Sequence, residues 1–216
     1  MKKIRFWAIG LCLILLISSV GILTASADAT LSEGVCGENV RWLLNTDTGE
    51  LTISGEGAVS DYSPLYFPLW LNAPVAITSV TMEEGITALG QYTFVYCFDL
   101  TEVTLPAGLT AIESLTFSCN DFTEVVIPEG VETIAPGLFC GYQALTSVTI
   151  PDSVEWIGEN AFLGCGNLET VRMGSGVTRI GEYAFESCTK LATLTLSEKL
   201  ETIDAYAFFN CTALQE

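Results

Sequence analysis

A repeat of 22 or 23 residues constrains the fold of this chain more than any other feature of its sequence. Two columns carry the repeat, a phenylalanine and an aliphatic residue five positions before it. The phenylalanines are Phe94, Phe117, Phe139, Phe162, Phe185 and Phe208, and the aliphatic residues are Leu89, Ile112, Ile134, Ile157, Ile180 and Ile203. Agreement of two independent columns over six copies excludes coincidence. Periods of roughly 20 to 50 residues are typical of solenoids and other repeat architectures.

Each unit predicts one short strand followed by a turn. In the unit that begins at Leu145, the residues Val148-Thr149-Ile150 alternate apolar and polar side chains, which is typical of a strand with one buried face. Pro151 ends the strand, because proline cannot donate a hydrogen bond to a ladder. The segment from Gly158 to Phe162 is expected to form a turn that leads into one helical or 3-10 turn and directs its last two residues inward.

A unit of this size cannot bury its apolar face alone, so the units must stack, with strands about 4.8 Å apart. The sequence therefore predicts a repeat solenoid, mainly β with short helical or 3-10 turns. Residues 77–216 hold six units and a seventh that is truncated at Glu216. The six units begin at Ile77, Leu100, Phe122, Leu145, Leu168 and Leu191. The second unit is one residue short between Phe117 and Cys119, which is expected to shift a turn without breaking the strand stack.

The last unit is not followed by the polar capping unit that solenoids normally have. We therefore expect one side of its core to face solvent, and the chain to be a fragment or a truncated reading frame. The residues expected to be exposed are Leu191, Leu194, Leu196, Leu200, Ile203 and Phe208.

Residues 1–27 are typical of a secretory signal peptide. A basic start precedes an almost entirely apolar stretch over residues 6–25, and Ala25-Ser26-Ala27 has the small-x-small pattern of a cleavage site. We expect cleavage after Ala27 and a secreted or cell-surface protein with no membrane insertion afterwards. The alternative is an uncleaved anchor helix, since about twenty apolar residues can span a bilayer.

Residues 28–76 do not follow the repeat and are expected to form an N-terminal capping β region. The alternating runs from Val40 to Asn45 and from Leu51 to Ser54 flank a turn-forming stretch, which predicts a β-hairpin. The loop that follows is rich in aromatic residues, which we expect to cover the first repeat rather than to bind a ligand. These residues are Tyr62, Tyr66, Phe67 and Trp70.

The composition excludes several classes of function. The chain has no histidine, so Ser-His-Asp catalysis, Cys-His catalysis and histidine-zinc sites cannot form. Its formal charge is −18, and removal of the three cations of the signal peptide makes this 5 − 26 = −21. Such a charge repels nucleic-acid phosphates and anionic membranes.

The acidic residues do not indicate a catalytic or metal site. Pairs such as Glu83 and Glu84 arise by chance among 26 acids, and the sequence has no calcium-loop motif. We therefore expect no catalytic residue, metal or cofactor.

Seven cysteines remain after cleavage, and six lie at or near position 21 of the units: Cys97, Cys119, Cys140, Cys165, Cys188 and Cys211. Export favours disulfides. However, equivalent Cβ atoms in stacked coils point in parallel, so bridging would strain the stack. We favour a column of packed thiols, since free cysteine is often buried. No two cysteines have C-x-x-C spacing, which argues against zinc.

The pattern L-x-x-V-x-I-P-x-x-V-x-x-I-G-x-x-A-F-x-x-C, complete from Leu145 to Cys165, resembles the BspA-like, or treponemal-type, class of leucine-rich repeat. The segments 36–42 and 48–57 resemble the region that often precedes such repeats in surface proteins of gut Firmicutes. The resemblance implies a curved leucine-rich-repeat array without catalytic residues, in secreted or surface proteins that adhere to host proteins and other cells. Departures from the pattern put single turns in doubt: Gly174 and Ser197 replace Pro, Phe122 replaces Leu, and Cys140 lies two places forward.

We expect the outward row of the main strands, at unit positions 3 and 5, to bind a partner. Position 3 holds Ser79, Glu102, Glu124, Ser147, Thr170 and Thr193, and position 5 holds Thr81, Thr104, Val126, Thr149, Arg172 and Thr195. Stacked, they would pave one face with hydroxyl groups; the alternative explanation is that threonine simply suits exposed strand positions. Arg172 and Trp156, which is expected to face solvent in the second turn, are our candidate hot spots, because Trp and Arg are enriched at such sites.

The sequence thus predicts an exported, non-catalytic leucine-rich repeat protein that mediates adhesion by binding proteins or glycans at the cell surface. The partners would be surface proteins or glycans of a host or a neighbouring cell, and not nucleic acid. The alternative is a targeting repeat module of a larger secreted hydrolase whose catalytic domain lies beyond Glu216. Substituting Trp156 and Arg172 together is predicted to weaken adhesion and to leave the β fold intact.

Overall fold

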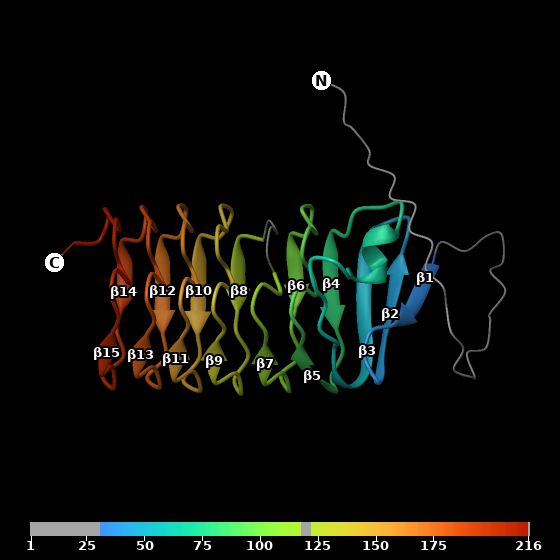
Figure 1. Cartoon of the computed structure of the whole chain (residues 1–216), viewed down its shortest axis with the longest axis horizontal. Coiled ribbons are helices and arrows are strands. Elements are labelled where there is room, and N and C mark those ends of the chain that lie inside the picture. The colour runs from blue at the N-terminus through green and yellow to red at the C-terminus, as the bar shows by residue number, and fades with distance from the viewer. Residues whose placement is uncertain (1–30, 118–121, 216) are drawn as a thin grey trace, which may run out of the picture.

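The protein is an elongated solenoid whose coils stack side by side along one axis (Figure 1). The computed structural model describes residues 31–117 and 122–215. The expected signal peptide and Cys119 lie outside the described residues. We number the coils by the six sequence units: coil 1 is residues 77–99, coil 2 100–121, coil 3 122–144, coil 4 145–167, coil 5 168–190 and coil 6 191–213.

Every coil contributes a main strand and then a shorter second strand. The main strands are β4 (Ser79–Met82), β6 (Glu102–Thr104), β8 (Glu124–Val126), β10 (Ser147–Ile150), β12 (Thr170–Met173) and β14 (Thr193–Thr195). The second strands are β5 (Ile86–Leu89), β7 (Ala111–Ile112), β9 (Thr133–Ile134), β11 (Trp156–Ile157), β13 (Arg179–Ile180) and β15 (Thr202–Ile203). Together they confirm the predicted β solenoid.

Equivalent residues of neighbouring coils lie beside each other in parallel register. Val148 of β10 pairs with Val171 of β12, and Ile157 of β11 pairs with Ile180 of β13. Both shifts equal the 23-residue period, so the repeat of the sequence becomes a set of straight columns in space. In β10 the alternation predicted from Val148-Thr149-Ile150 holds, because Val148 and Ile150 are buried and Thr149 is exposed.

The phenylalanine column forms the centre of the core. All of its rings from Phe94 to Phe185 are fully buried, and consecutive rings lie nearly parallel. In coils 3 to 6 the ring centroids are 5.0–5.2 Å apart, close to the spacing of paired strands. The coils therefore seal one another's apolar interior, as a stack of small units requires.

The turn before each phenylalanine is not a helix. In coil 4, Ala161 N–H donates to Gly158 O and Cys165 N–H to Phe162 O, which are the i, i+3 bonds of a 3-10 turn. However, Asn160 and Gly164 have positive φ angles of 56° and 73°, and residues at these two unit positions are left-handed in the other described coils as well. A left-handed residue interrupts helical winding, so the segment closes as separate turns.

The N-terminal region forms a three-stranded antiparallel sheet that continues into the solenoid. It consists of β1 (Leu31–Val35), β2 (Asn39–Asn45) and β3 (Glu50–Ala58), and β3 pairs in parallel with β4 through Leu51 and Val80. A short 3-10 helix, η1 (Leu69–Asn72), follows. Its Trp70 is fully buried 6.1 Å from Phe94 and so covers coil 1, whereas Tyr66 and Phe67 remain exposed.

The strand ladder is broken between coils 2 and 3, contrary to the expectation that the short second unit leaves the strand stack intact. In the described structure β6 pairs only with β4 and β8 only with β10, and β7 pairs only with β5 and β9 only with β11. No backbone hydrogen bond joins coil 2 to coil 3 among these residues. Figure 1 shows the wider step between β6 and β8. The expectation is therefore wrong, and we refer to this step as the ladder break.

Large side chains in coil 3 fill the space at the ladder break. Phe122 stands where the other coils have Leu or Ile, Leu138 where they have Ala or Thr, and Tyr142 where they have Cys, and all three are buried. The ring centroids of Phe117 and Phe139 are 6.2 Å apart, the longest step in the column. The extra volume of these three side chains in coil 3, together with the missing residue of coil 2, separates the backbones of the two coils. The core stays continuous across the step.

In coils 4 to 6 the cysteines at unit position 21 are thiols that form hydrogen bonds to the preceding coil. The Sγ atoms of Cys165, Cys188 and Cys211 donate to the carbonyl oxygens of Phe139, Phe162 and Phe185, at 3.1, 3.2 and 3.0 Å. In coil 3 the Tyr142 hydroxyl donates to Phe117 O in the same way, since its longer side chain reaches across the ladder break.

Native thiols should react slowly with a disulfide reagent. Burial raises the pKa of Cys165 to about 12, so at pH 8 the reactive thiolate is about a thousandfold rarer than in the unfolded chain. Titration of the thiols with the disulfide reagent, in the presence and absence of guanidinium, measures this difference in reactivity. Rapid labelling of Cys165 in the native protein would contradict it.

The same pKa makes stability depend on pH. Because the pKa of Cys165 is raised on folding, the contribution of this thiol to stability is full below about pH 9 and declines as the pH rises toward about 12.

The outer side of coil 6 is partly exposed, as the sequence predicts. Leu196 and Ile203 are exposed, whereas Leu194, Leu200 and Phe208 are half-buried. Leu191 is fully buried, contrary to the expectation, because Leu214 packs against the core one coil further along the same column.

Candidate binding surface

The main strands place the predicted row on one outward face. Alternation turns unit positions 4 and 6 into the core and leaves positions 3 and 5 outside. All six residues at position 5 are exposed, and those at position 3 are exposed or half-buried. We call this set the strand-face row; it comprises Ser79, Thr81, Glu102, Thr104, Glu124, Val126, Ser147, Thr149, Thr170, Arg172, Thr193 and Thr195.

The strand-face row changes character along the solenoid. In coils 4 to 6 it carries hydroxyl groups and one cation, Arg172, whereas in coils 2 and 3 it carries Glu102 and Glu124. Val126 is its only apolar member and is 70% exposed. The row is therefore a polar ladder with an acidic and apolar section beside the ladder break.

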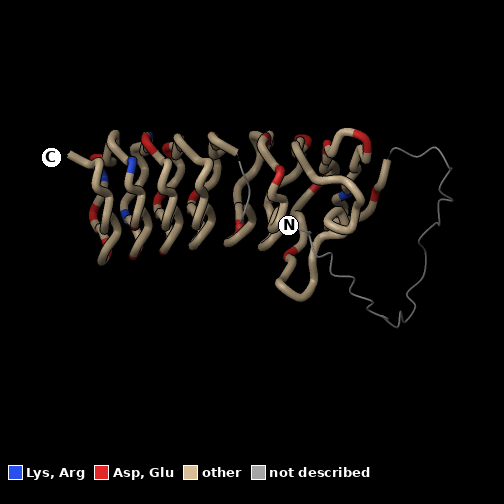
Figure 2. Tube along the Cα trace, turned by 90° about the horizontal axis from the view of Figure 1, so that it is seen from above, with Lys and Arg blue, Asp and Glu red and all other residues tan. Residues whose placement is uncertain are grey.

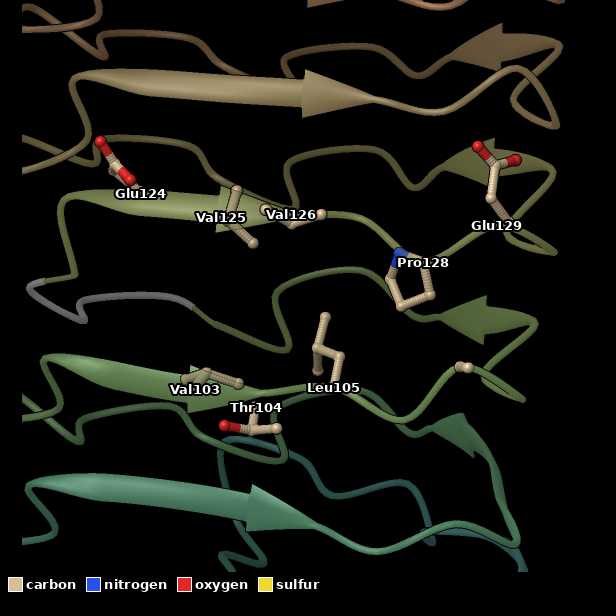
Figure 3. A pocket seen from close by; sticks show the side chains of 9 residues that line it. Val103, Thr104, Leu105, Glu124, Val125, Val126, Pro128 and Glu129 are labelled. Atoms are coloured by element: carbon tan, nitrogen blue, oxygen red, sulfur yellow. The ribbon is translucent and has the colours of Figure 1, made fainter.

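A groove of about 490 Å³ lies on this face at the ladder break (Figure 3). Its lining comes from coils 2 and 3, mainly from β6 and β8 and the turns that follow them. Apolar atoms come from Val103, Leu105, Val126 and Pro128, and carboxylates come from Glu124 and Glu129. The groove was not predicted from the sequence, where the short second unit and the unusual Val126 are its only signals.

Trp156 lies on a different sheet from the strand-face row. It belongs to β11 in the second row of strands, is half-buried, and has the Arg179 guanidinium 5.9 Å from its ring centroid. Arg179 also forms an ion pair with Asp204 at 2.7 Å. The ring borders a second hollow at the ladder break, of about 350 Å³. The structure therefore does not bring Trp156 and Arg172 together on one surface.

Charge is distributed unevenly along the solenoid (Figure 2). Between Arg41 and Arg172 the sequence has no lysine or arginine, and the cations after coil 4 are Arg172, Arg179, Lys190 and Lys199. Coils 1 to 4 thus have acids without cations. At the end of β10, Ser175 N–H donates to Asp152 Oδ1 at 2.7 Å, and this bond lowers the pKa of Asp152. The hydrogen bond from Ser175 thus stabilises the negative charge of the Asp152 carboxylate beside the strand-face row.

The geometry offers a broad polar surface with shallow grooves. In the part of the chain that the structure describes, no three His, Cys, Asp or Glu side chains are grouped to hold a metal ion. Within the same residues, no helix has the length and apolarity needed to cross a bilayer. The arrangement suits recognition over an extended area.

Comparison with known proteins identifies the repeat. The profile described as the BspA type leucine rich repeat region matches residues 72–190 and 116–216, with six copies. Comparison with curated proteins gives no match.

Solved structures share the fold. A leucine-rich repeat protein of T. pallidum has a TM-score of 0.63 and 24% identity, with 89% of this chain and 92% of that chain covered. A leucine-rich repeat protein of Eubacterium ventriosum has a TM-score of 0.58 and 19% identity, covering 86% and 71%. A leucine rich cell surface protein of Faecalibacterium prausnitzii has a TM-score of 0.51 and 26% identity, covering 81% of this chain and 56% of that one.

Proposed function

The chain belongs to the BspA-type leucine-rich repeat family, and we propose that it is an exported, non-catalytic protein that binds surface macromolecules through its strand-face row. Its partners are proteins or glycans on a host or neighbouring cell. Export is supported by the pattern of residues 1–27 and by the F. prausnitzii relative, which is described as a cell surface protein.

The observation that carries this proposal is the strand-face row itself. Coils 4 to 6 repeat the same outward positions in register, so hydroxyl groups recur at the strand spacing over this part of the face. Stable protein interfaces bury about 800 Å² on each partner, so such binding calls for a broad face and not for a deep pocket. Regularly spaced donors and acceptors match the repeated polar groups of an extended glycan or protein strand.

Removing hydroxyl groups from the row should weaken binding. Thr149→Val with Thr195→Val keeps side-chain shape and β propensity but removes two hydrogen-bonding groups. Each is worth about 0.5–1.5 kcal/mol, so binding should weaken roughly 5- to 150-fold. The measurement is the binding of labelled purified protein to fixed epithelial and bacterial cells, before and after the cells are treated with protease or glycosidase.

A matched control makes the same change on the second strands. Thr87→Val with Thr202→Val alters two exposed threonines of β5 and β15. The control should bind as the unmodified protein does. Equal weakening by both double variants, or by neither, would remove the strand-face row as the binding surface.

Arg172 and Trp156 are tested separately, because they lie on different sheets. If cells bind to the strand-face row, Arg172→Ala should weaken that binding, since Arg172 is the only cation of the row. Loss of binding in Trp156→Ala alone would instead assign the surface to the second strands. Circular dichroism should show an unchanged β signal in both variants.

A further inference from the structure

Among the described residues, β6 and β8 face each other at the ladder break without the backbone hydrogen bonds that join the main strands elsewhere. At the intact step, Ile127 N–H donates to Thr149 O and Thr170 N–H donates to Thr146 O. The equivalent pairs at the break are Leu105 N–H with Val126 O, and Glu124 N–H with Thr101 O. Neither pair forms a hydrogen bond in the described structure. Unpaired strand edges are templates for another extended chain.

The groove between these edges combines an apolar strip with an acidic margin. Figure 3 shows Val126, Pro128 and Leu105 along the strip, with Glu124 at one end and Glu129 at the other. Glu84 reaches the margin from coil 1, where its carboxylate accepts a hydrogen bond from Ala107 N–H at 3.3 Å. Val126 replaces the threonine or arginine of other coils, so the apolar strip is specific to this step.

The surroundings of the groove select the charge of an occupant. The nearest coils, 1 to 4, contain no lysine or arginine, so no basic side chain of these coils neutralises Glu84, Glu124 or Glu129. An occupant that carries cations gains from all three carboxylates. An acidic one is repelled, because like charges at an interface reduce affinity strongly.

We infer that the groove at the ladder break docks an extended, basic segment of a partner protein. The inference rests on the proposed binding function and names the chemistry of the partner. The partner's main chain meets the unpaired edges of β6 and β8, its cationic side chains meet the carboxylates, and its apolar side chains lie on Val126 and Pro128. Addition of a strand to a sheet edge is a recurrent mode of peptide recognition.

Synthetic peptides test this inference without cells. The lining from Glu124 to Glu129 is six residues long, about 20 Å in an extended chain, so a labelled peptide of about seven residues is long enough. A peptide with alternating lysine and valine should bind the purified chain in fluorescence anisotropy, and the glutamate–valine peptide should not. Binding should weaken between about 0.05 M and 0.5 M salt.

Two variants locate the peptide, and a third provides the matched control. Glu124→Gln with Glu129→Gln should weaken lysine–valine binding roughly 2- to 30-fold, since each exposed ion pair contributes modestly. Glu169→Gln with Glu198→Gln makes the same charge change in coils 5 and 6 and should have little effect. Val126→Thr restores the residue of other coils and should also weaken binding.

The outcomes separate this inference from the general binding role. An equal effect of the two glutamine pairs would mean binding by overall charge and would overturn the groove. Equal binding of a peptide N-methylated at alternate residues would overturn the main-chain pairing. Failure of all peptides, with cell binding still sensitive to Thr149→Val and Thr195→Val, would reject the groove and keep the proposed function.

Discussion

Phe162→Ala should lower the free energy of unfolding by about 3–5 kcal/mol, the usual cost of truncating a buried phenylalanine. The ring is fully buried between Phe139 at 5.2 Å and Phe185 at 5.0 Å. Its loss leaves a cavity on the solenoid axis, and neighbouring coils cannot close it because their backbones are held in register by β10, β11, β12 and β13.

Urea unfolding of Phe162→Ala against the unmodified chain measures this cost. Phe209→Ala is the matched control, since Phe209 is 56% exposed and the same atoms are removed from the surface. The control should change stability by less than about 1 kcal/mol. Similar costs for the two variants would mean that the phenylalanine column is not the centre of the core.

Trp70→Ala should destabilise the N-terminal end by about 3–5 kcal/mol. Trp70 is fully buried, and its ring lies 5.9 Å from Trp42 and 5.7 Å from Tyr62 as well as covering Phe94. Without it, the first coil is exposed to water on one side. Since coils stabilise only their neighbours, the loss should be concentrated in residues 31–112.

Amide hydrogen exchange resolves this effect along the chain. Protection should fall in β3 to β7 and persist in β10 to β15, because no backbone hydrogen bond between described residues couples the two parts across the ladder break. Leu69→Ala, next to Trp70 but 54% exposed, should leave exchange nearly unchanged. A uniform loss of protection over all coils would show that the solenoid unfolds as one unit.

The fold was predictable because each repeat position meets the same environment in six coils. The alternation at Val148-Thr149-Ile150 predicted a strand with one buried face, and the structure confirms it. The left-handed residues at Asn160 and Gly164 were harder to foresee, since local apolar pattern does not distinguish separate turns from a 3-10 turn.

The ladder break could not be predicted from one unit at a time. It depends on the joint volume of Phe122, Leu138 and Tyr142 and on one missing residue, and these four departures lie in two different units. For the same reason the groove was missed, although the outward placement of positions 3 and 5 followed from alternation. Their binding role remains a prediction.

In coils 4 to 6 the thiol donates to an acceptor on the coil before it, as Cys188 does to Phe162 O. Each unit of this kind brings one donor and one new acceptor, so these cysteines need no covalent partner when the number of units changes. Gene duplication and deletion can therefore lengthen or shorten the array by single units, and the number of cysteines in these units can be even or odd.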